Sequence, residues 1–362
     1  MFSFVLNVEG VYSPGLSIDE IQEKYGLSRV VKMASNENPL GTSPVVQEAI
    51  KAHAALSFRY PRSGNPALRQ AIAVKLGVGA ESVVAGNGSD EIIDLLIRVL
   101  CRPGQDNIVA FKPCFSIYGL QARLCGVEFR QASLNPDFGF DWEGLLSLVD
   151  EQTKIVFVTN PDNPSGHSVM ASELAGLLGR LPETALLVVD EAYVDFARPV
   201  EAYSSLGLLD SDRVAVLRTF SKLFGLAGLR LGHGVMPAEL AKALLSVRLP
   251  FSVNIMAEAA GMAALEDEAF IQTTLEVVQT GRERLTQGLK DLGCRVWPSQ
   301  ANFLMFRPPV PADGVFEALL RQGIIIRPLT SYDLSELLRV SVGTAEENEM
   351  FLTAMSGILG LG

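Results

Sequence analysis

One lysine of the sequence stands in surroundings that could make it reactive. Lys222 lies among small and apolar residues in the stretch RTFSKLFGLAGLRLG, and Arg230 follows eight positions later. Two interpretations compete, because burying an ammonium group is unfavourable. The lysine either reaches water at a surface turn, as most lysines do, or is kept partly dry. A partly dry amine is nucleophilic and can form a Schiff base with an aldehyde.

Polar residues follow three predicted strands at the point where each strand ends. They are Asn160 after KIVFVT, Asp190 and Tyr193 after ALLVV, and Thr219, Ser221 and Lys222 after VAVLR. In an open parallel sheet, ligands bind beyond the carboxyl ends of the strands, so these side chains should share one rim. Taken singly, Asn160 suits a turn, Asp190 a helix cap and Lys222 a solvated surface position. Taken together, they indicate a site.

These residue types match what an aldehyde cofactor with a pyridine ring and a phosphate requires. The lysine amine holds the aldehyde, a carboxylate keeps the ring nitrogen protonated, and a phenol and an amide hydrogen-bond the ring oxygen. The turn GNGSDE, from Gly86 to Glu91, runs into a predicted helix whose N-terminus can bind a phosphate. A dinucleotide fingerprint would need glycine where Glu91 stands, and the sequence contains no P-loop motif.

The elements that must position these residues alternate between strands and helices. Four nearly continuous apolar runs predict strands that are covered on both faces: NIVAF, KIVFVTN, ALLVVDE and RVAVLRTF. The segments between them are long enough for crossover helices. One of these helices, in GSDEIIDLLIRVLCRPG, offers Ser89 or Asp90 as its cap. The alternation indicates a mostly parallel α/β sheet.

After about residue 250 the pattern changes. A helical stretch from Ala257 to Leu292, with room for one break, precedes the runs CRVWPSQANFLMFR, GIIIRPL and LLRVSVG. These runs predict the strands of a second, smaller α+β domain. We therefore expect an N-terminal arm with a connection to the small domain over residues 1–40, a large cofactor-binding domain over 41–250, and a small C-terminal domain over 251–362.

Composition limits the partners and the compartment. The net charge of −11 and the lack of a basic run argue against nucleic acid or a membrane as a partner, although one pocket can still be locally positive. The four cysteines form no C-x-x-C pair and have no histidine close by, so we expect no metal site. Sparse cysteines, a poor signal sequence in MFSFVLNVEG and no membrane-spanning apolar run lead us to expect a cytoplasmic protein.

Motifs along nearly the whole chain resemble those of fold-type I pyridoxal-phosphate aminotransferases of class II. In chain order they are YSPG, KMASNENPLGTSP, RYPRSG, GNGSDE, KPCFSIY, NPDNPSG, VVDEAYVDF, RTFSKLFGLAGLRLG, GIIIRPL and LRVSVGT. The residues of NENPLG and RTFSKLFGLAGLR are most similar to those of the histidinol-phosphate branch of these aminotransferases. The resemblance implies pyridoxal 5'-phosphate as the cofactor. It also implies an α/β fold, with a large domain built on a mostly parallel mixed sheet flanked by helices and a smaller α+β domain.

The resemblance implies roles for residues at the cofactor. Lys222 is expected to be the catalytic Schiff-base lysine, Asp190 the partner of the pyridine nitrogen, and Tyr193 and Asn160 the contacts of the ring oxygen. Phe115 would stack on the ring, where many relatives have tyrosine. The residues expected around the phosphate are Ser89, Asp90, Thr219, Ser221, Arg230 and, from the partner subunit, Tyr60. The last of these implies a homodimer with shared active sites.

At the substrate, the resemblance implies that Arg339 pairs with a carboxylate or its equivalent. Arg327 and Tyr12 match positions that contact the substrate's phosphate or side chain, although Arg327 could equally pair with Asp333. The implied reaction is ping-pong transamination of L-histidinol phosphate with 2-oxoglutarate, giving imidazole acetol phosphate and glutamate, in histidine biosynthesis.

Several alternatives stay open at this point. An aromatic-amino-acid aminotransferase or a threonine-phosphate decarboxylase could share almost every cofactor residue, because the substrate pocket alone separates them. A non-catalytic cofactor-binding module, such as the sensor half of a regulator, lacks the expected helix-turn-helix extension or basic segment in this sequence. A nicotinamide-dependent dehydrogenase lacks the required glycine spacing.

Overall fold

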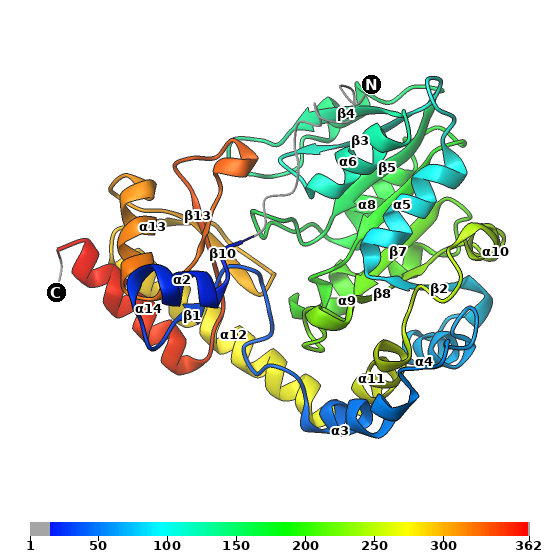
Figure 1. The fold of residues 1–362 in the computed structure, drawn as a ribbon. Coiled ribbons are helices and arrows are strands. Elements are labelled where there is room, and N and C mark those ends of the chain that lie inside the picture. Colours follow the sequence, from blue (N-terminus) through cyan, green and yellow to red (C-terminus); the bar gives the residue numbers. More distant parts are fainter. Residues whose placement is uncertain (1–14, 361–362) are drawn as a thin grey trace, which may run out of the picture.

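A seven-stranded sheet forms the centre of the computed structural model, which describes residues 15–360 (Figure 1). The strand order is β2-β8-β7-β6-β5-β3-β4; β8 is antiparallel to β2 and β7, and the other pairs are parallel. The strands are β2 (Val83–Asn87), β3 (Asn107–Lys112), β4 (Glu128–Ser133), β5 (Thr153–Thr159), β6 (Leu186–Asp190), β7 (Val214–Thr219) and β8 (Leu231–Val235). This mixed, mostly parallel sheet confirms the predicted α/β fold class.

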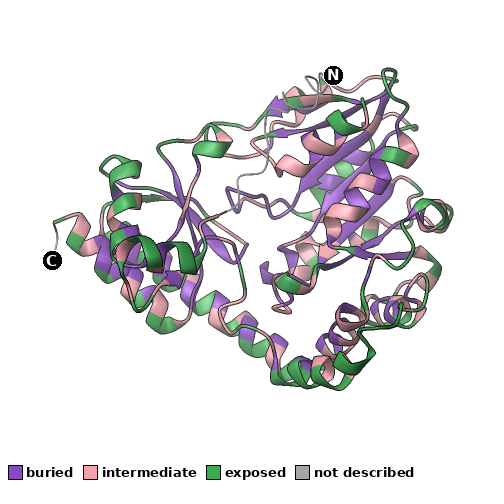
Figure 2. Cartoon of the chain, viewed as in Figure 1, coloured by how far each residue is buried: buried purple, intermediate pink, exposed green. Residues whose placement is uncertain are grey.

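Alternate residues of the central strands enter two separate cores, one on each face of the sheet. In β5, Ile155 and Phe157 pack into the first core, whereas Val156 and Val158 pack into the second. The first core is covered by α5 (Ser89–Leu100), α6 (Ser116–Leu124) and α10 (Ala238–Val247), and the second by α7 (Trp142–Leu146) and α8 (Ala171–Leu178). Figure 2 shows these strands as the most continuously buried part of the chain. Burial on both faces is the reason why the strands are apolar throughout.

A third group of helices packs at the β2–β8 edge of the sheet. It consists of α3 (Pro44–His53), α4 (Pro66–Leu76) and α11 (Ile255–Glu266). After α11, Asp267 breaks the helical path, and its carboxylate accepts a hydrogen bond from the Phe270 amide at 3.1 Å. The helical stretch predicted over 257–292 is therefore two helices, α11 and α12 (Glu268–Asp291).

The long helix α12 runs from the β2–β8 edge of the large sheet to a second, antiparallel sheet (Figure 1). That sheet has the order β12-β13-β10-β9 and packs with α12 and two further helices. The strands are β9 (Arg295–Val296), β10 (Phe303–Arg307), β12 (Arg327–Pro328) and β13 (Leu338–Ser341). The two further helices are α13 (Ala312–Arg321) and α14 (Ala345–Ile358). Within residues 15–360, no helix combines the length and apolar character needed to cross a bilayer.

The first described residues join this second part of the molecule. Strand β1 (Val31–Lys32) pairs in parallel with β11 (Ile324–Ile325), and α2 (Ile18–Tyr25) precedes it. The chain then continues through residues 33–43 toward the large sheet. On this path it passes the carboxyl ends of β6 and β7, where Asn36 contacts Tyr193 after β6 and Ser35 contacts Lys222 after β7. The N-terminal segment therefore closes one side of the site described next.

Candidate active site

A cavity of about 400 Å³ lies at the carboxyl ends of the central strands. Nine of the residues expected from the sequence line it: Ser89, Asp90, Phe115, Asp190, Tyr193, Thr219, Ser221, Lys222 and Arg230. They come from strand ends, from the start of α5 and from the residue before α6. The rim predicted from the strand ends is therefore formed, except at Asn160, since parallel strands deliver their last residues to one edge.

Lys222 follows the end of β7 and reaches into this cavity. Its Nζ donates a hydrogen bond to the Ser35 carbonyl at 3.1 Å and lies 5.8 Å from the centre of the Tyr193 ring. Burial, assisted by the positive charge of Arg339, lowers the pKa of Lys222 to about 8. A lowered pKa leaves more of the amine neutral near pH 7, and the neutral amine is the nucleophile. Of the two interpretations of the lysine, the structure favours the partly dry one.

Asp190 is the last residue of β6, and its side chain is buried at the cavity floor. Its Oδ1 accepts a hydrogen bond from the Ala192 amide at 3.1 Å, and its Oδ2 accepts one from the Tyr118 hydroxyl at 2.7 Å. Burial raises the pKa of Asp190 to about 6, with those hydrogen bonds acting in the opposite direction. The group is thus an anion at neutral pH, in a place where a cationic ligand atom would stabilise it.

Tyr193 presents a phenol to the same cavity. Its oxygen accepts hydrogen bonds from the side-chain amides of Asn36 at 3.0 Å and Asn163 at 3.4 Å. Burial raises the pKa of Tyr193 to about 12, so the hydroxyl stays protonated at neutral pH. Because both neighbouring amides donate to its oxygen, the O–H bond of Tyr193 remains available to donate to a ligand.

The structure does not bring Asn160 to the cavity. Its amide nitrogen donates to the carbonyls of Val169 at 3.0 Å and Tyr203 at 3.2 Å, and its oxygen accepts from the Val169 amide. These hydrogen bonds hold the loop after β5 in place, and the Asn160 side chain is fully buried. Asn163, three residues later, lines the cavity instead. The motif NPDNPSG holds both asparagines, and only the path of its turn decides which amide faces the phenol.

An anion-binding cup forms at the start of α5. Gly88 occupies the N-cap position with φ +77°, so no side chain caps this helix, unlike the predicted capping by Ser89 or Asp90. The first-turn amides of α5 therefore remain available to an anion. Arg230 adds a positive charge and forms an ion pair with Asp90 at 3.1 Å.

Two further details shape the cup. The Thr219 and Ser221 hydroxyls lie 3.0 Å apart beside it. A β-carbon at Gly232 would lie only 2.4 Å from the Ser89 amide nitrogen, so glycine there lets β8 approach the helix start.

The remaining predicted residues lie outside the cavity lining. Arg339 in β13 is 5% exposed; it donates to Asn163 Oδ1 and to the Ala34 carbonyl at 2.9 Å, and its Nε has no hydrogen-bond partner. Arg327 in β12 stands directly opposite Arg339 in the antiparallel register. Asp333, the alternative partner of Arg327, forms an ion pair with Lys112 at 2.8 Å.

Two further predicted residues are Tyr60, which lies on the surface of the chain, and Tyr12. Tyr60 is 79% exposed and stacks on Phe251, with 4.6 Å between the ring centres. Tyr12 lies outside the described residues. Within residues 15–360, Tyr60 is not part of the cavity lining.

The donor set of the cavity fits pyridoxal 5'-phosphate. It combines an amine with a lowered pKa, a buried carboxylate, a protonated phenol and an uncapped helix N-terminus beside an arginine. These groups match, in the same order, an aldehyde, a pyridine nitrogen, a ring oxygen and a phosphate. Three polar residues of this region were not predicted from the sequence: Asn36, Tyr118 and Asn163. Their only signal was their place inside the motifs KMASNENPLGTSP, KPCFSIY and NPDNPSG.

Comparisons with known proteins agree with this geometry. The profile of the family described as aminotransferase class I and II matches residues 28–355. The histidinol-phosphate aminotransferase of Nitratidesulfovibrio vulgaris (strain Hildenborough) is 62% identical over 349 residues, covering 96% of this chain and 94% of that protein. The histidinol-phosphate aminotransferase of Oleidesulfovibrio alaskensis is 59% identical over 353 residues, covering 96% and 92%.

A solved structure extends the similarity to the fold. The histidinol-phosphate aminotransferase of Sinorhizobium meliloti, in complex with pyridoxal-5'-phosphate, superposes with a TM-score of 0.88 at 26% identity, covering 99% of this chain and 97% of that chain. The resemblance stated from the motifs is confirmed, and the dehydrogenase alternative is wrong. The chain belongs to the family of class I and II aminotransferases, which are pyridoxal-phosphate enzymes, and its relatives of high identity are histidinol-phosphate aminotransferases.

Proposed function

We propose that this aminotransferase transfers the amino group of L-histidinol phosphate to 2-oxoglutarate, giving imidazole acetol phosphate and glutamate, as a step of histidine biosynthesis. The observation that carries the proposal is the name shared by relatives up to 62% identical over nearly the full chain. The charge pattern supports it. The chain carries a net charge of −11, yet Arg339 and Arg327 stand on neighbouring strands and Arg230 stands at the cavity. Like charges placed opposite each other favour an anionic ligand between them.

Within this proposal, Lys222 and Asp190 have the central roles. When bound, pyridoxal phosphate supplies an aldehyde and an electron-withdrawing ring. Lys222 would hold the aldehyde carbon until the substrate's amine displaces it. The freed neutral amine of Lys222 would then take a proton from the substrate's α-carbon and later return one, as a general base and acid. The lowered pKa of Lys222, about 8, suits both directions of transfer near neutral pH. Asp190 would hold the ring nitrogen through its buried negative charge.

The other cavity residues would bind and orient. Tyr193 and, in place of Asn160, Asn163 would hold the ring oxygen, and Phe115 would cover the ring face. The cofactor's phosphate would be held by the backbone amides of Ser89 and Asp90 at the start of α5, the hydroxyls of Ser89, Thr219 and Ser221, and the guanidinium of Arg230. Arg339 would pair with the anionic group of the substrate, and its Nε is a buried donor without a partner. Arg327 and Tyr12 remain proposed contacts of the substrate's phosphate.

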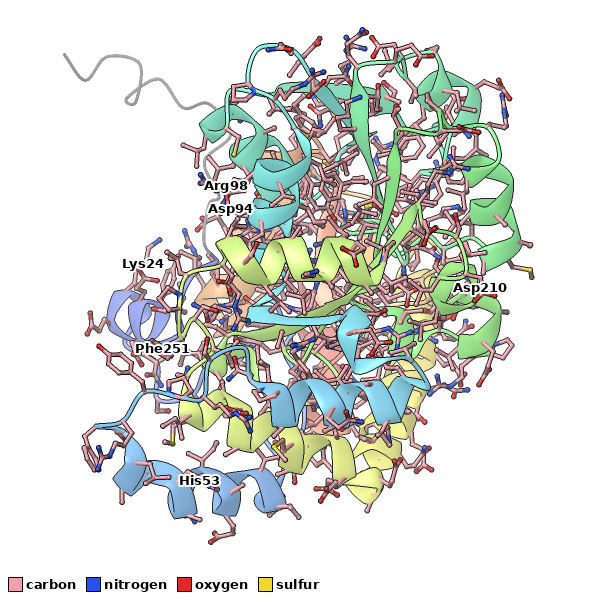
Figure 3. All side chains as sticks on the ribbon, turned by 90° about the vertical axis from the view of Figure 1, so that its right-hand side faces the viewer. Lys24, His53, Asp94, Arg98, Asp210 and Phe251 are labelled. Atoms are coloured by element: carbon pink, nitrogen blue, oxygen red, sulfur yellow. The ribbon has the colours of Figure 1, made fainter. Side chains whose placement is uncertain are left out.

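We also propose a homodimer in which Tyr60 reaches the phosphate of the partner's cofactor. A cluster of exposed apolar side chains supports this assembly, because large exposed apolar patches mark interfaces. The cluster comprises Phe58 (74% exposed), Tyr60 (79%), Leu249 (74%) and Phe251 (37%). Figure 3 shows Phe251 at the surface of the molecule.

Two further expectations belong to the same proposal. We place the protein in the cytoplasm, which the free thiols of its four cysteines support, since disulfides are rare in reducing compartments. We also divide the chain into an arm over 1–40, a large domain over 41–250 and a small domain over 251–362, except that α11 packs against the large sheet and therefore belongs with the large domain. The separate seven-stranded and four-stranded sheets support that division.

A single-turnover experiment tests the substrate. The purified holoenzyme is mixed separately with L-histidinol phosphate, L-phenylalanine and L-threonine phosphate while its visible absorption band is followed. We expect fast loss of the band with histidinol phosphate alone. Equal rates with phenylalanine would support the aromatic aminotransferase alternative and overturn the narrow proposal.

The variant Arg327→Met tests the proposed contact with the substrate's phosphate. It should raise the KM for histidinol phosphate by about tenfold or more, because a hydrogen bond from a charged group is lost. It should leave the rate with phenylalanine unchanged.

A further inference from the structure

Tyr118 is a buried polar residue to which the mechanism above assigns no role. It lies in α6, three residues after Phe115, and its side chain is 0% exposed. It does not line the cavity and would therefore not contact a ligand bound there. Its hydroxyl is nevertheless 2.7 Å from Asp190 Oδ2, which makes it the side-chain hydrogen-bond donor to this carboxylate among the described residues.

The hydroxyl has a fixed donor direction. Tyr118 Oη is also 2.9 Å from Thr159 Oγ1, at the end of β5. Because an ionised carboxylate can only accept, the Tyr118 proton points to Asp190, and the Thr159 hydroxyl donates to Tyr118. The result is a short chain of hydrogen bonds from Thr159 through Tyr118 to Asp190. Hydrogen bonds to an ionised acceptor are about twice as strong as neutral ones.

The ring of Tyr118 is held as firmly as its hydroxyl. It stacks on Phe157 with 4.4 Å between ring centres and 10° between ring planes. It also meets Phe115 edge to face at 5.8 Å and 86°. Phe115 and Asp190 both line the cavity. One buried side chain thus supports two of the groups that face the cofactor.

The electrostatic surroundings show why Asp190 needs a donor. Burial raises the pKa of Asp190, and the like charges of Asp90 and Glu191 raise it further. The groups that act against this are the Tyr118 hydroxyl from α6 and the Ala192 amide on the chain after β6. The Tyr118 donor is a side-chain hydroxyl, so a substitution can remove it. The Ala192 donor is a backbone amide, which such a substitution leaves in place.

We propose that Tyr118 is a positioning residue of the transamination site, whose hydroxyl orients the Asp190 carboxylate and keeps its negative charge directed at the cofactor's ring nitrogen. This inference rests on the proposed function, because it assumes that Asp190 faces that nitrogen. It predicts that the Tyr118 hydroxyl acts on the reaction only through Asp190. A residue that merely fills the core would affect stability without changing the electronic properties of the bound cofactor.

The test compares holoenzymes of the wild type, Tyr118→Phe and the control Tyr203→Phe. Phenylalanine keeps the stacked ring and removes only the hydroxyl. Tyr203 carries a phenol outside the cavity that bonds Gln300, so its loss measures the general effect of deleting a hydroxyl. The readouts are the pH titration of the visible cofactor band and the single-turnover rate with histidinol phosphate. Both Phe substitutions are repeated in an Asp190→Asn background, which gives a double-mutant cycle.

We expect Tyr118→Phe to shift the midpoint of the band's titration and to slow the single turnover by about tenfold, the effect of losing one hydrogen bond to a charged group. Tyr203→Phe should change neither readout. In the Asp190→Asn background, Tyr118→Phe should add no further slowing. A ring-fluorinated tyrosine at position 118, which is a stronger donor, should move the titration midpoint in the opposite direction to Tyr118→Phe.

Three results would overturn the inference. The first is a titration for Tyr118→Phe that matches Tyr203→Phe, and the second is the same slowing in both Asp190 backgrounds. The third is a fluorinated variant that moves the midpoint in the same direction as Tyr118→Phe. If the wild type itself formed no visible band with pyridoxal phosphate, the proposed function would fail as well, whereas the first three results leave that function intact.

Discussion

The buried ammonium group of Lys222 should destabilise the cofactor-free protein in a way that depends on pH. The pKa of this lysine falls from 10.5 to about 8 in the folded chain, chiefly through burial. Between these two values the unfolded chain binds more protons than the folded one, so the stability contributed by this site rises with pH. The destabilisation is complete below pH 8 and disappears as the pH passes 10.5.

The size of the effect follows from the shift. A difference of about 2.5 units, at about 1.36 kcal/mol per unit, amounts to about 3.4 kcal/mol at pH 7. At pH 10 the folded lysine is neutral and the unfolded one partly so, which leaves about 0.8 kcal/mol. In Lys222→Met the side chain keeps its length and loses the charge. The stability of this variant relative to the wild type should therefore be about 2.5 kcal/mol more favourable at pH 7 than at pH 10. The lost bond to the Ser35 carbonyl affects both pH values alike.

Urea unfolding of the cofactor-free proteins, at one fixed protein concentration and followed by far-UV circular dichroism, measures the difference. The exposed residue Lys242 provides the control Lys242→Met, which corrects for the general loss of one lysine charge. A relative stability of Lys222→Met that is the same at both pH values would refute the reasoning, since the lysine would then not be held in a desolvated place.

Two further predictions concern the cup and the cavity. Gly232→Ala places a β-carbon 2.4 Å from the Ser89 amide nitrogen, so the start of α5 must move. We expect the affinity for pyridoxal phosphate to fall about tenfold or more. Titration of the cofactor-free protein with pyridoxal phosphate measures this affinity. Gly176→Ala, where a β-carbon meets nothing within 4 Å, is the control, and equal affinities of the two variants would contradict the prediction. Asn163→Ala should lower kcat/KM about tenfold and change the cofactor spectrum, and it should also lower the Tm because the buried Arg339 loses one of its acceptors. Asn160→Ala should lower the stability by about 2 kcal/mol and leave the cofactor spectrum unchanged. A cofactor spectrum that changes in Asn160→Ala but not in Asn163→Ala would restore Asn160 to the cofactor.

The sequence by itself determined the framework of the site. Apolar runs without alternation predicted strands covered on both faces, and the residues after those runs had to meet at one edge because parallel strands end on the same side. Lys222, Asp190 and Tyr193 could be placed at the cavity for this reason alone. The start of α5 could be recognised in the same way, because a glycine turn before an amphipathic helix marks an anion site through local geometry.

Only the tertiary structure decided which of several equivalent side chains complete the site. Asn160 and Asn163 share one short motif, and the hydrogen bonds of the loop after β5 turn the first inward and the second toward Tyr193. Asn36 comes to the same phenol from a segment more than 150 positions earlier in the chain. Tyr118 lies inside a helix, where its spacing indicates only a core position, and its bond to Asp190 depends on how α6 packs on the sheet. Contacts of this kind are set by packing between elements, for which the local sequence carries no signal.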